Sequence, residues 1–227
     1  MQKQSHKFKI MFTYKYPHPA ITADCVVLAF DGKDIRVLLI ERKNNPYAGC
    51  WAFPGGFMEI DEAVEESARR ELIEETGFPC DCFEQFHVFS KVDRDERERV
   101  VTVAFLALLP YLPDVKAADD AKKAEWHKLS ELPALAFDHK EIIEEAQTVL
   151  RKRARLEPVL FKLLPSSFKM EDLKTVYEQV HRVNLGNEDF KAKMDRLDFL
   201  DHNADATYSL NADRYNKYVQ ELMNAIF

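Results

Sequence analysis

Residues 55–78 read GGFMEIDEAVEESARRELIEETGF, and this stretch decides the fold. Its middle predicts one amphipathic helix, because apolar side chains recur at helical spacing and neither Pro nor Gly interrupts the run. Asp61 is expected to be the N-cap, and Gly77 stands where a helix commonly ends. The expected apolar stripe consists of Val64, Ala68, Leu72 and Ile73.

An acidic pattern occupies the C-terminal end of this helix. Glu71, Glu74 and Glu75 stand at i, i+3 and i+4, so their carboxylates project from one face and repel one another. A hard divalent cation such as Mg²⁺ or Mn²⁺ would neutralise them through oxygen ligands. The alternative is a solvated acidic face, which is the usual interpretation of an isolated E-x-x-E-E. Gly55 and Gly56 precede the helix and let backbone approach a ligand closely.

The surrounding residues favour the functional interpretation. The stretch matches the spaced pattern G-x5-E-x7-R-E-U-x-E-E-x-G-U, where U is a bulky apolar residue, and it therefore resembles the Nudix box. The fixed positions are Gly56, Glu62, Arg70, Glu71, Leu72, Glu74, Glu75, Gly77 and Phe78. The resemblance implies an α+β fold in which an α/β/α sandwich encloses a mixed sheet. It also implies hydrolysis of a nucleoside diphosphate linked to another moiety.

Residue roles follow from the same resemblance. It implies metal ligands at Glu71, Glu74 and Glu75, with Glu62 assisting and Arg70 holding the glutamates by ion pairing. Glu62, Arg70 and Glu75 are thus the candidate catalytic residues. The chemistry is consistent, because a charged pyrophosphate resists attack by water until metal ions neutralise it and activate the water.

Length and composition set broad limits. The chain of 227 residues has room for one large domain or two small ones. No apolar run approaches the ~20 residues that span a membrane, and the polar N-terminus lacks a signal-peptide core. Cys25, Cys50, Cys80 and Cys82 lack the spacing of a usual zinc site, which favours reduced thiols in a cytoplasmic protein.

Apolar runs rich in β-formers predict a sheet around the box. Asp31-Gly32 is a hairpin signal between the first two strands. The expected strands are Ala20–Phe30, Ile35–Glu41, Cys50–Phe53, Cys82–Val92 and Val100–Leu109.

A mixed-charge loop, residues 93–99, separates the last two of these strands. Taken alone, it is a solvated hairpin tip. The family resemblance adds the alternative that Arg94, Arg97 and Arg99 contact phosphate oxygens of a ligand, together with the backbone of Gly55 and Gly56.

Two further segments before residue 150, around Trp126 and around His139, are interpreted as structural. Trp126 is expected to be a packing residue in a stretch that is common near the end of Nudix domains. Phe137, Asp138 and His139 precede a helix expected from about Lys140, and they are interpreted as a cap with a core aromatic. His139 is only an outside candidate for a site.

The composition changes near residue 150, which predicts a Nudix domain at 1–149 and a second domain at 150–227. Two helices, a two-stranded ribbon and a closing helix form the outline of a winged helix-turn-helix, although a helical protein-binding module has a similar outline. The expected elements are Met170–His181, Asn187–Asp198, Phe199–His202 with Ala206–Leu210, and Arg214–Phe227.

Spaced residues support the DNA-binding alternative, because they resemble the C-terminal domain of Nudix-related transcriptional regulators. They are Glu157, Pro158, Phe161, Leu164, Pro165, Phe168, Leu173, Tyr177, Glu178, Phe190, Lys193 and Leu197. The expected DNA contacts are Arg151, Arg153, Lys191, Lys193 and Arg196. The second helix opens with Glu188-Asp189 where relatives often carry arginines. Residues 150–227 hold 13 Lys and Arg against 12 Asp and Glu, so their net charge alone does not indicate nucleic-acid binding.

Two functions follow from these resemblances. The first is a homodimeric transcriptional regulator that binds operator DNA and senses ADP-ribose, or a pentose such as L-arabinose in control of carbohydrate metabolism. The alternative is a Mg²⁺-dependent Nudix hydrolase that cleaves a nucleoside diphosphate such as ADP-ribose. The intact box leaves enzymatic activity open, and neither function calls for a membrane.

Overall fold

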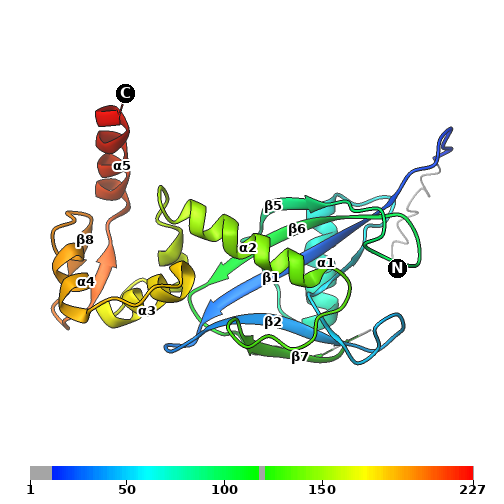
Figure 1. The fold of residues 1–227 in the computed structure, drawn as a ribbon, viewed down its shortest axis with the longest axis horizontal. Coiled ribbons are helices and arrows are strands. Elements are labelled where there is room, and N and C mark those ends of the chain that lie inside the picture. The colour runs from blue at the N-terminus through cyan, green and yellow to red at the C-terminus, as the bar shows by residue number, and fades with distance from the viewer. Residues whose placement is uncertain (1–11, 118–120, 227) are drawn as a thin grey trace, which may run out of the picture.

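A mixed seven-stranded sheet forms the centre of the computed structural model, which describes residues 12–117 and 121–226 (Figure 1). The central strands β1 and β6 pair in parallel, whereas the other strand pairs are antiparallel. The strands are β1 Ala20–Phe30, β2 Ile35–Arg42, β3 Trp51–Ala52, β4 Gly55–Phe57, β5 Glu84–Phe89, β6 Val100–Leu109 and β7 Ala121–Lys128.

Helices cover both faces of this sheet, α1 (Val64–Thr76) on one and α2 (His139–Arg153) on the other (Figure 1). Successive side chains of β1 enter different cores: Cys25 and Val27 pack with α1, whereas Val26 and Leu28 pack with α2. Burial on both faces explains why β1 reads as a continuous apolar run. The expected α/β/α sandwich is confirmed.

The start of α1 differs from the expectation. Its N-cap is Ala63 and not Asp61, and the Glu66 carboxylate accepts a hydrogen bond from the Ala63 amide at 2.7 Å. The C-terminal end of α1 is as predicted, because Gly77 ends the helix in the left-handed conformation with a φ of 68°. Ile73 is 45% exposed, so it does not join the buried apolar stripe.

Strand β7 was not expected. Its sequence AKKAEWHK is mostly polar, and the strand forms because it pairs with β2 from Arg36 to Arg42. Trp126 has the expected packing role, since it is half-buried beside the α1 core and its Nε1 donates to the Pro113 carbonyl at 3.1 Å.

The C-terminal part contains the expected helices and ribbon. The elements are the short 3-10 helix η1 Val159–Leu163, α3 Met170–His181, α4 Asn187–Met194, β8 Leu200–His202, β9 Tyr208–Leu210 and α5 Ala212–Ile226. The second helix is shorter than expected, because the chain leaves the helix at Asp195 and turns. Arg196 therefore lies after α4 and not on it. Figure 1 shows α5 extending away from the rest of the molecule.

The two parts are joined by packing and by hydrogen bonds. Apolar residues form one continuous core from the α2 face of the sheet to α3, α4 and the ribbon. The Gln179 amide on α3 accepts from the Ile35 amide and donates to the Lys33 carbonyl, both at 2.8 Å. The third helix is thereby attached to the β1–β2 hairpin.

The proposed boundary between residues 149 and 150 falls inside α2, which continues to Arg153. A division after α2 fits the structure better, because a helix is one rigid element. Residues 1–11 of the first proposed domain and the expected helix end at Phe227 lie outside the described residues. Among the helices that the structure describes, none combines the length and the apolar character of a membrane span.

Candidate functional site

A pocket of about 530 Å³ opens between the start of β1, the turn before α1 and the loop that precedes α2. Its size is within the range of small-molecule sites. One wall is acidic and includes Asp24, Glu71, Glu74 and Glu75, and the pocket lining also includes arginine and aromatic side chains.

The glycine turn brings backbone against the glutamates of α1. The Gly55 amide donates to the Glu75 carboxylate at 2.9 Å. A Cβ on Gly56 would overlap the Glu71 carboxylate, so only glycine permits this close approach. Burial raises the pKa of Glu75 to about 8, and the nearby charges of Glu71 and Asp24 act in the same direction. Burial also raises the pKa of Glu71.

Arg70 has the ion-pairing role that the sequence predicted. It makes two hydrogen bonds to Glu62, at 3.0 and 2.6 Å, and others to Glu71 at 2.7 Å and Glu74 at 3.0 Å. Its Nη2 also donates to the Phe57 carbonyl at 3.0 Å. The hydrogen bonds that Arg70 donates to Glu62, followed by those to Glu71 and Glu74, raise its pKa.

Glu71, Glu74 and Glu75 suit a hard cation chemically, because all three are oxygen donors on one face of α1, beside backbone that approaches closely. Within residues 12–117 and 121–226, however, no three acidic, histidine or cysteine side chains converge closely enough to hold a metal ion. Glu74 is 43% exposed and turned toward Arg70. A metal site at Glu71, Glu74 and Glu75 therefore stays a prediction and requires Glu74 to turn inward.

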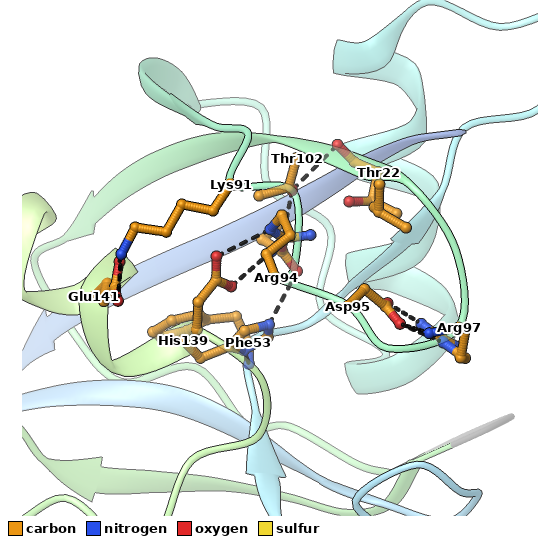
Figure 2. A network of polar contacts seen from close by, with 12 residues as sticks. Thr22, Phe53, Lys91, Arg94, Asp95, Arg97, Thr102, His139 and Glu141 are labelled. Carbon is orange, nitrogen blue, oxygen red and sulfur yellow. Dashed lines mark hydrogen bonds and ion pairs between the residues drawn. The ribbon is translucent and has the colours of Figure 1, made fainter. Parts of the chain in front are cut away.

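The three arginines of the charged loop have different surroundings, and Figure 2 shows two of them, Arg94 and Arg97. Arg94 is largely buried, lines the pocket and forms a two-point ion pair with Asp138. Arg97 lines the pocket and pairs with Asp95 at 3.0 and 2.7 Å. Arg99 does not line this pocket and donates to backbone carbonyls, including that of Ser90 at 2.9 Å.

A buried polar network that the sequence did not reveal borders the pocket and includes Asp24 of the acidic wall (Figure 2). His139 accepts from the Phe53 amide through Nδ1 at 3.0 Å, and its Nε2 lies 3.7 Å from the Asp24 carboxylate. Asp24 also accepts from the Thr102 hydroxyl at 2.6 Å. Burial lowers the pKa of His139 and so favours the neutral ring. A neutral ring is required for Nδ1 to accept the hydrogen bond from the Phe53 amide.

The expected cap before α2 is wrong in one respect. Asp138 occupies the N-cap position, but its side chain makes no capping bond and binds Arg94.

One sequence signal could have indicated Asp24 as a site residue, because it is an acidic residue inside the otherwise apolar run of β1. No comparable local signal marks His139, because only the fold brings it to Asp24.

The candidate DNA contacts divide into two groups. Lys191, Lys193 and Arg196 are exposed on α4 and the following turn. Arg153 pairs with Glu84 and with Glu157, each at 2.6 Å, and so ties the end of α2 to β5. Arg151 donates to the Thr148 hydroxyl at 3.0 Å. The structure thus gives Arg153 a structural role in place of a free phosphate contact.

The fold and the pocket define a Nudix domain followed by a helix-turn-helix with a ribbon. The NUDIX domain family matches residues 18–146, and the chain belongs to this family, in the group of Nudix-related regulators.

The chain is similar to two curated relatives and to one solved structure. An ADP-ribose pyrophosphatase of Methanocaldococcus jannaschii is 46% identical over 130 residues, which cover 57% of this chain and 74% of the relative. The ADPR responsive transcriptional repressor NtrR of Acinetobacter baylyi is 31% identical over 183 residues, covering 79% of this chain and 73% of the relative. Shewanella oneidensis NrtR complexed with a 27mer DNA has a TM-score of 0.66 at 27% identity, covering 86% of this chain and 95% of that chain.

Proposed function

We propose that this protein is an ADP-ribose-responsive transcriptional regulator. The observation that carries the proposal is the union, in one chain, of the Nudix pocket and a C-terminal helix-turn-helix with its ribbon. The similarity to the ADPR responsive repressor extends over both parts, since it spans 79% of the chain. An ordinary hydrolase has no need of the second part.

The pocket supplies groups for a charged nucleotide ligand. Mg²⁺ or Mn²⁺ held by Glu71, Glu74 and Glu75 would offset the negative charge of the two phosphates. Gly55 and Gly56 would border the diphosphate through their backbone, and Arg97 would contact the ligand directly. Arg94 and Arg99 would act indirectly by fixing the loop.

DNA recognition is assigned to α4 and the turn after it. Lys191, Lys193 and Arg196 would meet operator phosphates, and a homodimer would place two such helices on two half-sites. Arg151 would contribute at the edge. Because operator DNA lies in the cytoplasm of a bacterium or archaeon, the proposal implies a cytoplasmic protein.

Ligand binding would change the placement of the recognition helices relative to each other. The hydrogen bonds of Gln179 to the β1–β2 hairpin and the shared apolar core provide a physical connection between the two parts. A ligand shifts such an equilibrium only by binding one arrangement more tightly than the other.

A second function is favoured by one observation. Every fixed position of the Nudix box is present, and the relative with 46% identity is an ADP-ribose pyrophosphatase. Glu62, Arg70 and Glu75 would then be the catalytic residues of a divalent-metal-dependent hydrolase. The two functions are compatible in one protein.

The test is a gel-shift titration with the DNA upstream of the gene for this protein, with Mg²⁺ and either ADP-ribose or L-arabinose. The expected result is a shift that ADP-ribose, and not L-arabinose, reverses or strengthens. The double variant Glu74→Gln, Glu75→Gln should still bind DNA but lose any hydrolysis. Absence of a shift, with ribose phosphate products in the same tubes, would contradict the regulator and support the enzyme.

A further inference from the structure

Two cysteine side chains outside the pocket lie against each other. The Sγ atoms of Cys80 and Cys82 are 3.0 Å apart, in the segment that joins α1 to β5. Cys80 is buried in the core beneath α1, whereas Cys82 is exposed. Close approach of two thiols is the geometric condition for a disulfide, and one exposed partner gives an oxidant access to the pair.

The two thiols of this pair differ in reactivity. A hydrogen bond from the Cys80 thiol lowers the pKa of Cys82 to about 7, and the positive charge of Lys162 acts in the same direction. The same hydrogen bond raises the pKa of Cys80, and burial adds to this effect. Because the thiolate is the nucleophile, Cys82 is the attacking group and Cys80 remains a protonated thiol beside it.

The other two cysteines of the chain have different surroundings. Cys25 is completely buried, and its thiol donates to the Ala68 carbonyl at 3.5 Å. Burial raises the pKa of Cys25 and so keeps it protonated. Cys50 is half-buried in the sequence stretch that leads into β3. Buried, protonated thiols react slowly with oxidants, so Cys25 is protected.

The cysteine pair lies where the sheet meets the start of the C-terminal part. Glu84 begins β5 and pairs with Lys162 of η1 at 2.5 Å and with Arg153 of α2 at 2.6 Å. Disulfide geometry is specific, so a bridge between residues this close in sequence fixes the backbone just before Glu84. Oxidation of the pair therefore acts on the segment that carries these contacts.

We propose that Cys80 and Cys82 form a reversible redox site, at which a hydroperoxide oxidises the two thiols to an intrachain disulfide. The Cys82 thiolate attacks one peroxide oxygen, the O–O bond breaks, and a sulfenic acid forms as the leaving oxygen takes up a proton. The Cys80 sulfur then attacks the Cys82 sulfur, the S–O bond breaks, and the hydroxyl leaves with the Cys80 proton as water. The pair loses two electrons, and the hydroperoxide gains them. This inference is independent of the proposed function, since it uses neither the pocket nor DNA.

The test treats the full-length protein with hydrogen peroxide, blocks free thiols with iodoacetamide and analyses the tryptic fragments by mass spectrometry. Cleavage after Arg70 and Lys91 releases residues 71–91, which contain both cysteines of the pair and no methionine. This fragment should lose the mass of two hydrogen atoms and escape alkylation. Dithiothreitol should restore two alkylatable thiols. Cys50→Ser is the matched control and should form the bridge as wild type does.

Two variants separate the roles of the pair. Cys82→Ser changes an exposed side chain and should abolish the bridge. Cys80→Ala removes the second thiol, so Cys82 should stop at the sulfenic acid, which dimedone labels. Three results would overturn the proposal: an unchanged wild-type fragment in excess peroxide, uptake of oxygen by this fragment without a bridge, or a bridge between two chains on non-reducing electrophoresis.

Discussion

The Arg94 guanidinium and the Asp138 carboxylate form a two-point ion pair, with nitrogen–oxygen distances of 3.0 and 2.8 Å. Their side chains are 4% and 9% exposed. The pair joins the loop after β5 to the start of α2, and Arg94 also lines the pocket. Lys91 and Glu141 join the same two elements at the surface, with side chains 64% and 48% exposed.

Asp138→Asn should destabilise the protein by up to about 3–5 kcal/mol, because it removes the two-point partner of the buried Arg94 charge and leaves only Asp24, at 3.7 Å. Urea unfolding measures this free energy. Glu141→Gln is the matched control and should cost less than about 1 kcal/mol, since exposed pairs contribute little. Similar losses in the two variants would show that the buried pair has no special role.

Stability should depend on pH through Glu75. Its pKa is raised from 4.5 to about 8 in the folded protein, so the folded state holds the proton more tightly than the unfolded state. The resulting stabilisation is complete below pH 4.5 and is lost as the pH rises through about 8. Glu75→Gln should therefore be more stable than wild type at pH 8–9 by roughly 2–5 kcal/mol.

This difference would be measured by thermal unfolding in the presence of EDTA, which removes competing cations. The variant should lack the decline in stability between pH 5 and 8 that is expected for wild type. Glu131→Gln changes a glutamate whose side chain is 71% exposed and should follow the wild-type curve. Parallel curves for wild type and Glu75→Gln would contradict the prediction.

Gly56→Ala should weaken binding of Mn²⁺ roughly 10- to 100-fold, the range seen when groups that orient metal ligands are changed. The added Cβ would displace the Glu71 carboxylate from its position against the backbone. Electron paramagnetic resonance of free Mn²⁺ measures the affinity. Gly186→Ala is the control, because its nearest contact would be the Asp189 carboxylate at 3.6 Å. Unchanged Mn²⁺ affinity in Gly56→Ala would exclude Glu71 as a ligand.

Lys191→Ala and Lys193→Ala should each weaken operator binding and reduce the slope of log affinity against log salt concentration by about 0.9. Fluorescence anisotropy at several salt concentrations measures both quantities. Arg153→Ala should leave the slope unchanged, because Arg153 is paired with Glu84 and Glu157. A reduced slope for Arg153→Ala alone would indicate that DNA contacts the end of α2 and not α4.

Local patterns were sufficient for some elements. β1 and β6 have the predicted bounds, because buried central strands carry long apolar runs that end at polar residues. β7 could not be predicted, since its polar sequence becomes a strand only by pairing with β2. The early end of α4 was missed for a related reason: the residues after Met194 keep an apolar spacing but form a turn.

The sequence by itself determined the acidic face of α1, because the helical repeat alone places Glu71, Glu74 and Glu75 together. It likewise determined the glycine turn and the order of the C-terminal elements. Only the tertiary structure decided that Asp24, Arg94, Asp138 and His139 meet at the pocket, and that Arg97 faces two phenylalanine rings. These residues come from separate segments, and their contacts depend on how two helices and the loops pack against the sheet. Local periodicity carries no information about that packing.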